Sequence, residues 1–303
     1  GGGTGSNTGL GARTLIGGGR APGDLNLIDF FTITTLGNSE DFGDLTDARN
    51  QLAAHSSRTR GIWGGGYGGF HDNIDFVTIS STGTATTFGN IHDHLVRYPT
   101  GLSNTTRGLL IGGYDGSAVR NELRYVTIAS TGDTVDFGDS AGGTHYASSA
   151  CASSTRGIFQ RGSTIDIEFI TISTLGNAAE FGNTLLTNQS GQFGLSNSVR
   201  GIFAGGYTPG GTNVNAISYI SISTLGNALD FGDLTRTNAA YGASLASATR
   251  GVFAGGGKWP AGTNVIDYVQ IMSTGNAIDF GDCIDSKVPL GAFGCSNGHG
   301  GLG

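Results

Sequence analysis

The sequence predicts an all-β fold, a six-bladed β-propeller with four strands in each blade. A unit recurs six times along the 303 residues, and the arginines that open successive units lie 44 to 50 residues apart. That spacing suits one four-stranded blade. Each unit holds short β-branched and aromatic runs separated by Gly, Asn and Ser, which is the pattern of strands and turns. No segment keeps an apolar period of 3.6 residues for three turns, so little helix is expected.

Five of the six units open with Arg-Gly and the first with Arg13-Thr14; apolar residues and usually Gly-Gly follow, and each unit closes with Phe-Gly-Asp or Phe-Gly-Asn. Blades bury their faces only against neighbouring blades, so the units predict one closed domain over residues 11–298, with Gly-rich tails at 1–10 and 299–303. The opening arginines are Arg13, Arg60, Arg107, Arg156, Arg200 and Arg250. The closing phenylalanines are Phe42, Phe88, Phe137, Phe181, Phe231 and Phe280.

Four strands, A to D, are expected in each unit. In the fifth unit they are Ser190–Ser196, Arg200–Gly206, Ala216–Ser223 and Ala228–Phe231. Strand A is expected to be innermost, because its Ala, Gly and Ser residues allow close approach near the axis. The other A strands are expected at Gln51–Ser56, Thr100–Asn104, Tyr146–Cys151, Tyr241–Ser247 and Leu290–Ser296. Strand B is more apolar, and its large residues Trp63, Phe159, Phe203 and Phe253 are expected in the core.

The spacing of the motifs predicts how the ring closes. Each closing Phe precedes the next opening Arg by 18 or 19 residues, and 19 residues after Phe280 comes His299, near the end of the chain. Leu290–Ser296 is therefore expected to supply strand A of the blade whose strands B, C and D are N-terminal. This closure removes a free sheet edge. Both Gly-rich tails are then expected to leave the ring from nearly the same place.

The two faces of the ring are expected to differ. Chain direction alternates within a blade, so the A–B and C–D turns share one face and the B–C and D–A loops share the other. Nearly all length variation falls in the B–C loops. We call the first the uniform face and the second the loop face, and we expect recognition on the loop face. The candidate binding residues are Tyr67, Phe70, His71, Tyr114, Tyr207, Lys258 and Trp259.

Composition narrows the classes of partner. The formal net charge is -7, only 13% of residues are charged, and two lysines are present. No basic run exists, so nucleic acid is not an expected partner. No apolar stretch approaches the roughly 18 residues of a membrane span, so no membrane insertion is expected. Cys151, Cys283 and Cys295 are too few and too far apart for a disulfide scaffold and are expected to be buried thiols.

No motif for catalysis or cofactor binding stands out, so no enzyme activity and no cofactor is predicted. His92-Asp93-His94 is the densest group of potential ligands, but it lacks an identifiable third ligand, and no metal site is predicted. The glycine runs have no following Lys-Ser/Thr, as a phosphate-binding loop would. The repeated arginines either form a structural ladder on backbone carbonyls or carboxylates, which we favour, or a ring that binds an anionic sugar.

The double glycine followed by an aromatic residue, as in Gly113-Tyr114 and Gly206-Tyr207, resembles kelch-type propeller repeats. The resemblance covers about residues 11–298, although Phe stands where the kelch repeat has a late Trp. Repeats in virion fibre and structural proteins of marine bacteriophages, especially those of cyanobacteria, are similar in sequence to three segments of this chain: Thr249–Gly256, Asn264–Ile271 and Ser273–Asp282. That resemblance implies a binding role outside the cell or on a virion surface, and it carries no catalytic residues.

These observations predict a non-catalytic propeller that binds a protein partner in a virion or surface assembly, or a host glycan, through its B–C loops. Aromatic residues in loops serve stacking and interfaces, and Trp259 beside Lys258 is expected to be one of them. Two alternatives remain open at this point. One is a self-assembling subunit whose rings stack into a filament or appendage. The other is a carbohydrate-active enzyme with a site at the propeller mouth.

Overall fold

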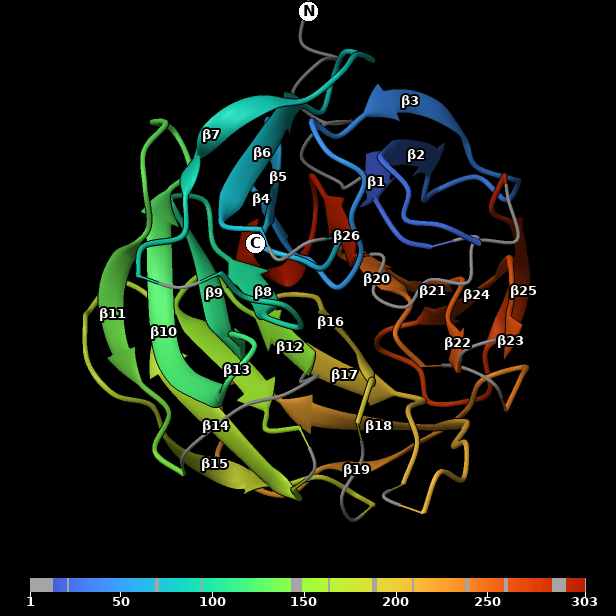
Figure 1. Cartoon of the computed structure of the whole chain (residues 1–303). Helices are drawn as coiled ribbons and strands as arrows, with labels where there is room; N and C mark the ends of the chain where they lie inside the picture. The colour runs from blue at the N-terminus through green and yellow to red at the C-terminus, as the bar shows by residue number, and fades with distance from the viewer. Residues whose placement is uncertain are drawn as a thin grey trace, which may run out of the picture.

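A computed structural model describes residues 13–302 except 21, 69–70, 94, 143–148, 163, 187–189, 209, 238–239, 259–260 and 285–292. Six antiparallel four-stranded sheets surround a central axis (Figure 1). The predicted six-bladed β-propeller is therefore confirmed. The only helix among the described residues is one 3-10 turn, η1 (Gly300–Leu302). In this part of the chain, no helix has the length and apolar character needed to cross a membrane.

Each blade contributes one strand to each of four concentric positions, with strand A at the centre of Figure 1 and strand D outermost. In order from blade I to blade VI, the A strands are β26 (Phe293–Ser296), β4 (Ala53–Ser56), β8 (Thr100–Ser103), β12 (Ser149–Ala152), β16 (Phe193–Ser196) and β20 (Ala243–Ala246). The B strands are β1 (Arg13–Gly17), β5 (Arg60–Gly64), β9 (Arg107–Tyr114), β13 (Arg156–Gln160), β17 (Arg200–Ala204) and β21 (Arg250–Ala254).

The outer strands follow in the same order. The C strands are β2 (Leu27–Thr32), β6 (Asn73–Thr78), β10 (Val119–Thr127), β14 (Asp166–Thr171), β18 (Ala216–Ser221) and β24 (Val265–Gln270). The D strands are β3 (Glu40–Asp44), β7 (Thr86–Asn90), β11 (Val135–Asp139), β15 (Ala179–Asn183), β19 (Leu229–Asp233) and β25 (Ile278–Asp282). A short hairpin, β22 (Gly257–Lys258) with β23 (Ala261–Gly262), extends the B–C loop of blade VI.

Blade I joins the two ends of the chain. Strand β26 pairs antiparallel with β1, with Cys295 opposite Leu15, and the sheet order is β26-β1-β2-β3. The sequence predicted that the chain leaves the ring after this strand, and this prediction is wrong for residues 297–302. Residues 297–302 turn back over the end of the central channel, where Leu302 is buried.

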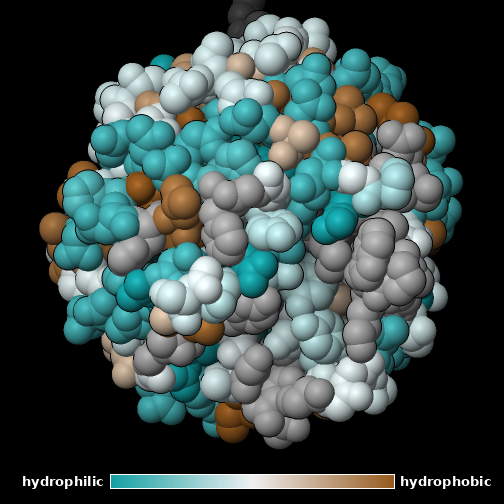
Figure 2. Space-filling view, in the orientation of Figure 1, coloured by the Kyte–Doolittle hydropathy of each residue, from teal (hydrophilic) through white to brown (hydrophobic). Residues whose placement is uncertain are grey.

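The core lies between blades. Each large cluster of buried apolar side chains combines two neighbouring blades, as where Leu15 and Ile28 of blade I meet Trp63 of blade II. Trp63, Phe159, Phe203 and Phe253 are fully buried, as predicted. All three cysteines are buried thiols. Figure 2 shows that the coloured surface facing the viewer is mainly hydrophilic, with apolar atoms in small groups.

The six repeated arginines link each blade to the next. Every one donates from Nη1 to the carbonyl oxygen of the isoleucine that follows strand C in the next blade, at 2.8 to 3.0 Å. The guanidinium also lies 4.2 to 4.8 Å above an aromatic ring of its own strand C, as Arg156 lies over Phe169. The last link runs from Arg250 of blade VI to Ile33 of blade I, so the ladder is a closed ring.

The Phe-Gly-Asp or Phe-Gly-Asn motif of each blade contacts the C–D turn of the following blade. Gly132 N–H, for example, donates to Phe88 O at 2.9 Å, and the same bond recurs around the ring. A Cβ on Gly89 would lie 2.1 Å from Gly132 O, so only glycine lets the turn approach. The glycine of Arg-Gly has a parallel role, because a Cβ on Gly201 would lie 2.6 Å from Cys151 Sγ of the preceding blade. The repeated motifs are therefore contacts between blades.

Candidate functional site

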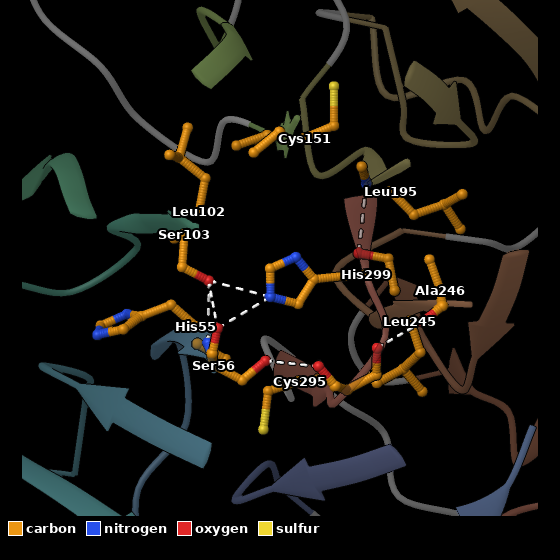
Figure 3. Close-up of a pocket in the computed structure, with 18 of the residues that line it drawn as sticks. His55, Ser56, Leu102, Ser103, Cys151, Leu195, Leu245, Ala246, Cys295 and His299 are labelled. Carbon is orange, nitrogen blue, oxygen red and sulfur yellow. Dashed lines mark hydrogen bonds between the residues drawn. The ribbon is translucent and has the colours of Figure 1, made fainter. Parts of the chain in front are cut away.

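The central channel is narrow. Its cavity has a volume of about 70 Å³ and is lined by the six A strands (Figure 3). Small residues bring these strands together, since a Cβ on Gly101 would lie 2.3 Å from Ala54 O. Pockets for small molecules usually measure about 300 to 1,000 Å³. This cavity has room for a few water molecules, and residues 297–302 cover its end on the uniform face.

On the loop face, at the opposite side of the ring, three tyrosines occupy matching positions. Tyr67, Tyr114 and Tyr207 each follow the double glycine of strand B in their blades. Each forms an isolated β-bridge with the D–A loop of its own blade, to Asn50, Arg97 and Ser190, respectively. These backbone bridges therefore fix the main-chain positions from which the three tyrosine rings extend.

Arg97 joins two of these tyrosines. Its guanidinium carbon lies 5.2 Å from the ring centroid of Tyr67, 4.6 Å from that of Tyr114 and 5.9 Å from that of Tyr98. A cation stacked on aromatic rings is attracted by their negative faces, and the guanidinium plane suits such stacking. Arg97 thus gathers aromatic side chains from blades II and III.

Tyr98 and Tyr241 extend this group across the mouth. They belong to blades III and VI, on opposite sides of the ring, yet their ring centroids are only 5.9 Å apart. Tyr241 also packs on Tyr207 of blade V at 5.6 Å, and their hydroxyl groups are hydrogen-bonded. We call Tyr67, Arg97, Tyr98, Tyr114, Tyr207 and Tyr241 the aromatic belt. It runs from blade II to blade VI over the channel.

Three non-glycine residues at or near the belt have a strained, left-handed backbone conformation. Tyr98 and Tyr241 have φ of 58° and 57°, and Gln51 at the matching position of blade II has 61°. Non-glycine residues rarely adopt this left-handed conformation, and such strain concentrates at functional sites. Blade V has Gly191 there with φ of 70°, and the Tyr241 ring lies 3.1 Å from where its Cβ would be. The chain thus accepts strain where a tyrosine reaches over the mouth.

The loops around the belt are firmly held. In blade III, Asp115 accepts hydrogen bonds from Ser117 N and Ala118 N at 2.8 and 2.7 Å. These bonds, with those from the Ser117 hydroxyl and Arg120, lower the pKa of Asp115 despite some desolvation. Tyr114 hydroxyl donates to Gly116 O at 2.7 Å in the same loop. The B–C loop of blade III therefore presents its tyrosine from an ordered turn.

Buried arginines anchor other loops of this face. Arg49, from the D–A loop between blades I and II, donates to Gly65 O and Asn73 O at 2.8 Å and pairs with Asp75. Arg236 does the same for blade VI, where it donates to Val265 O and pairs with Asp267. Burial lowers the pKa of both arginines, and the neighbouring carboxylates oppose that shift.

The structure places the predicted binding residues unequally. Tyr67, Tyr114 and Tyr207 come together in the belt, and His71 lies half-buried near Gly68 and Asp24 rather than in it. Lys258 lies in β22, while Phe70 and Trp259 fall outside the described residues. The variable B–C loops, from which recognition was predicted, do not include Arg97, Tyr98 and Tyr241, which lie in D–A loops. Their signal was position, since both tyrosines stand two residues before a small-residue A strand.

The remaining group of potential ligands in the sequence is His92-Asp93-His94. His92 Nδ1 lies 2.6 Å from Asp93 Oδ2 and both side chains are largely exposed, while His94 lies outside the described residues. Within the described part of the chain, no three His, Cys, Asp or Glu side chains are grouped as metal ligands. Comparison with protein-family profiles and with curated protein sequences finds no match for this chain.

Proposed function

We propose that this protein is a non-catalytic binding module of an extracellular or virion surface and that it recognises a glycan through the aromatic belt. The fold supports a binding or assembly module in general, because it presents loops from a closed ring of blades. The observation that carries the finer proposal is the belt itself, five tyrosines and an arginine gathered from four blades at one mouth.

The chemistry of the belt suits a sugar. Tyrosine rings offer flat apolar faces to the C–H groups of a pyranose and hydroxyl groups to its oxygens. The backbone around the rings is held before any ligand arrives, which reduces the entropy that binding must overcome. The narrow channel beneath points to a ligand that lies across the mouth rather than one that enters the ring.

A second candidate function, self-assembly, has its own observation on the other face. Apolar side chains at or just after the C–D turns are more than half exposed in five of the blades, so they recur around one side of the ring. We call them the apolar rim: Leu36, Val135, Leu175, Leu225, Leu229, Met272 and Ile278. Contact through this rim would stack copies of the chain.

One pair of variants separates the two functions. Tyr114→Ala in the belt and Leu225→Ala in the rim are each tested on an array of bacterial polysaccharides and by light scattering for molecular mass. We expect Tyr114→Ala to lose at least tenfold in affinity for the polysaccharide that the unmodified chain binds, and Leu225→Ala to keep it. Equal binding by Tyr114→Ala, or no binding by the unmodified chain, contradicts glycan recognition. A mass that falls only in Leu225→Ala supports assembly instead.

A further inference from the structure

Residues 297–302 are seated across the ring at the uniform face. They follow β26 of blade I, and η1 lies against β8, β12 and β16 of blades III, IV and V. Leu302 is 2% exposed, and its carbonyl oxygen accepts a hydrogen bond from Arg58 in the A–B turn of blade II. This short segment therefore contacts blades on the far side of the axis from the blade that it continues.

The seat accepts glycine only. A Cβ on Gly301 would lie 1.8 Å from Ser103 O, and a Cβ on Gly300 would lie 2.1 Å from Asn197 O. Neither gap can hold a side chain unless the A strands separate, because both neighbouring atoms are backbone. The glycines that suggested a loose tail in the sequence are the residues that allow this close fit.

His299 holds the segment at its centre and points into the cavity (Figure 3). Its Nδ1 accepts a hydrogen bond from Gly301 N at 3.2 Å, so the ring proton belongs on Nε2. Nε2 then donates to Ser56 O at 2.9 Å, with Ser103 Oγ at 3.2 Å. This network uses the neutral imidazole and assigns one tautomer to it. A second proton would place a donor on Nδ1 against the Gly301 N–H.

Among the described residues that line the cavity, no negatively charged group compensates a charge on His299. The titratable groups that line the cavity with it are His55 on β4, Cys151 on β12 and Cys295 on β26, and no carboxylate is among the described lining residues. The charged neighbour is Arg58. Burial lowers the pKa of His299 to about 4; the bond to Ser56 O opposes this shift and Arg58 adds to it. Burial, and then the proximity of His299, lowers the pKa of His55 to about 3.

We propose that residues 297–302 form an acid-labile latch, which neutral His299 locks across the ring and which protonation of His299 releases. The latch ties blade I, which joins the chain ends, to the blades opposite it. In neutral solution it closes the channel on the uniform face. In acid the imidazolium repels Arg58, loses the bond from Gly301 and leaves the cavity for water.

The test is amide hydrogen exchange in residues 297–302 of the whole chain between pH 7 and pH 3.5, corrected for intrinsic rates, with His299 protonation followed by NMR. Protection is expected to fall at least tenfold as His299 gains its proton, while amides of strands B and C stay protected. His299→Gln keeps a donor for Ser56 O and cannot be protonated in this range, so it should keep protection to pH 3.5. The exposed His92→Gln serves as control and should follow the unmodified chain.

Two results would overturn the latch. One is protection that persists in the unmodified chain after His299 is protonated. The other is loss of protection in His299→Gln at the same pH as in the unmodified chain. If His299→Gln fails to fold, Gly301→Ala provides a separate test, because its methyl group cannot fit the seat. That variant should lack protection in residues 297–302 at pH 7, and full protection there would also refute the proposal.

Discussion

The two faces of this ring are built in opposite ways. On the uniform face, every blade repeats one set of contacts, an arginine to the next blade's isoleucine carbonyl and a glycine beneath the next C–D turn. On the loop face, the contacts change from blade to blade, with Arg49 on Asp75 at one place and Arg97 among tyrosines at another. A closed ring needs its inter-blade contact six times, whereas a binding site is needed once. Repetition thus marks architecture, and departure from it marks candidate recognition.

The largest expected effect tests this contrast with one substitution on each face. Gly138→Ala should destabilise the ring by about 3 kcal/mol or more, because φ is 143° and the new Cβ would lie 2.5 Å from Gly176 O. Gly210→Ala in a B–C loop should change stability by less than about 0.5 kcal/mol, since its nearest neighbour is 3.9 Å away. Urea unfolding of both variants measures the difference. Equal losses of unfolding free energy in the two variants would contradict the proposed difference between the faces.

A smaller effect compares two arginines that both stack on aromatic rings. Arg156→Ala removes an inter-blade hydrogen bond of 2.8 Å and a stacked cation, and should cost about 2 to 3 kcal/mol. Arg97→Ala should cost about 1 kcal/mol and lower glycan affinity. Calorimetry and the polysaccharide array test these together. A larger loss of stability for Arg97→Ala would place it among the architectural arginines.

The smallest effect concerns an exception on the repeated side. His55 stands where three other blades have leucine, and neither ring nitrogen has a hydrogen-bond partner among the described residues. His55→Leu should stabilise the ring by about 1 kcal/mol at pH 7, because the unsatisfied polar atoms are removed.

The same variant predicts a pH dependence. Burial lowers the pKa of His55 to about 3 in the folded chain, below the roughly 6.5 of an unfolded histidine. As pH falls, the unfolded chain therefore binds this proton before the folded chain does. The free energy of unfolding then decreases by about 1.4 kcal/mol per pH unit as pH falls from 6.5 toward 3. The advantage of His55→Leu should grow by that amount in urea titrations at pH 6, 5.5 and 5. A constant advantage would contradict neutral burial of His55.

The repeat made most of the fold predictable. The arginine and phenylalanine positions located six blades, and the alternation around Ile217 and Tyr219 located strands in each. What the repeat could not show was the fate of residues 297–302, because their glycines are equally suited to a free tail and to a tight seat. Only the distances to Ser103 O and Asn197 O distinguish the two.

The site was predictable only in part. Tyr67, Tyr114 and Tyr207 share a repeat position after the double glycine, so the sequence already grouped them. Tyr98 and Tyr241 are 143 residues apart in the chain, and their contact depends on the ring bringing blades III and VI together over the axis. No local pattern reports such a contact, nor does one reveal the positive φ that directs both side chains over the mouth.

The most direct test of the division between the faces is Tyr241→Gly, measured for stability by urea unfolding and for binding on the polysaccharide array. Glycine adopts φ of 57° without strain, as Gly191 does in blade V. Tyr241 is buried, so relief of strain should offset only part of the lost contacts and the loss of stability should stay below about 3 kcal/mol, while affinity falls at least tenfold. A loss above about 3 kcal/mol with affinity unchanged would show that the belt holds the ring together rather than recognising a ligand.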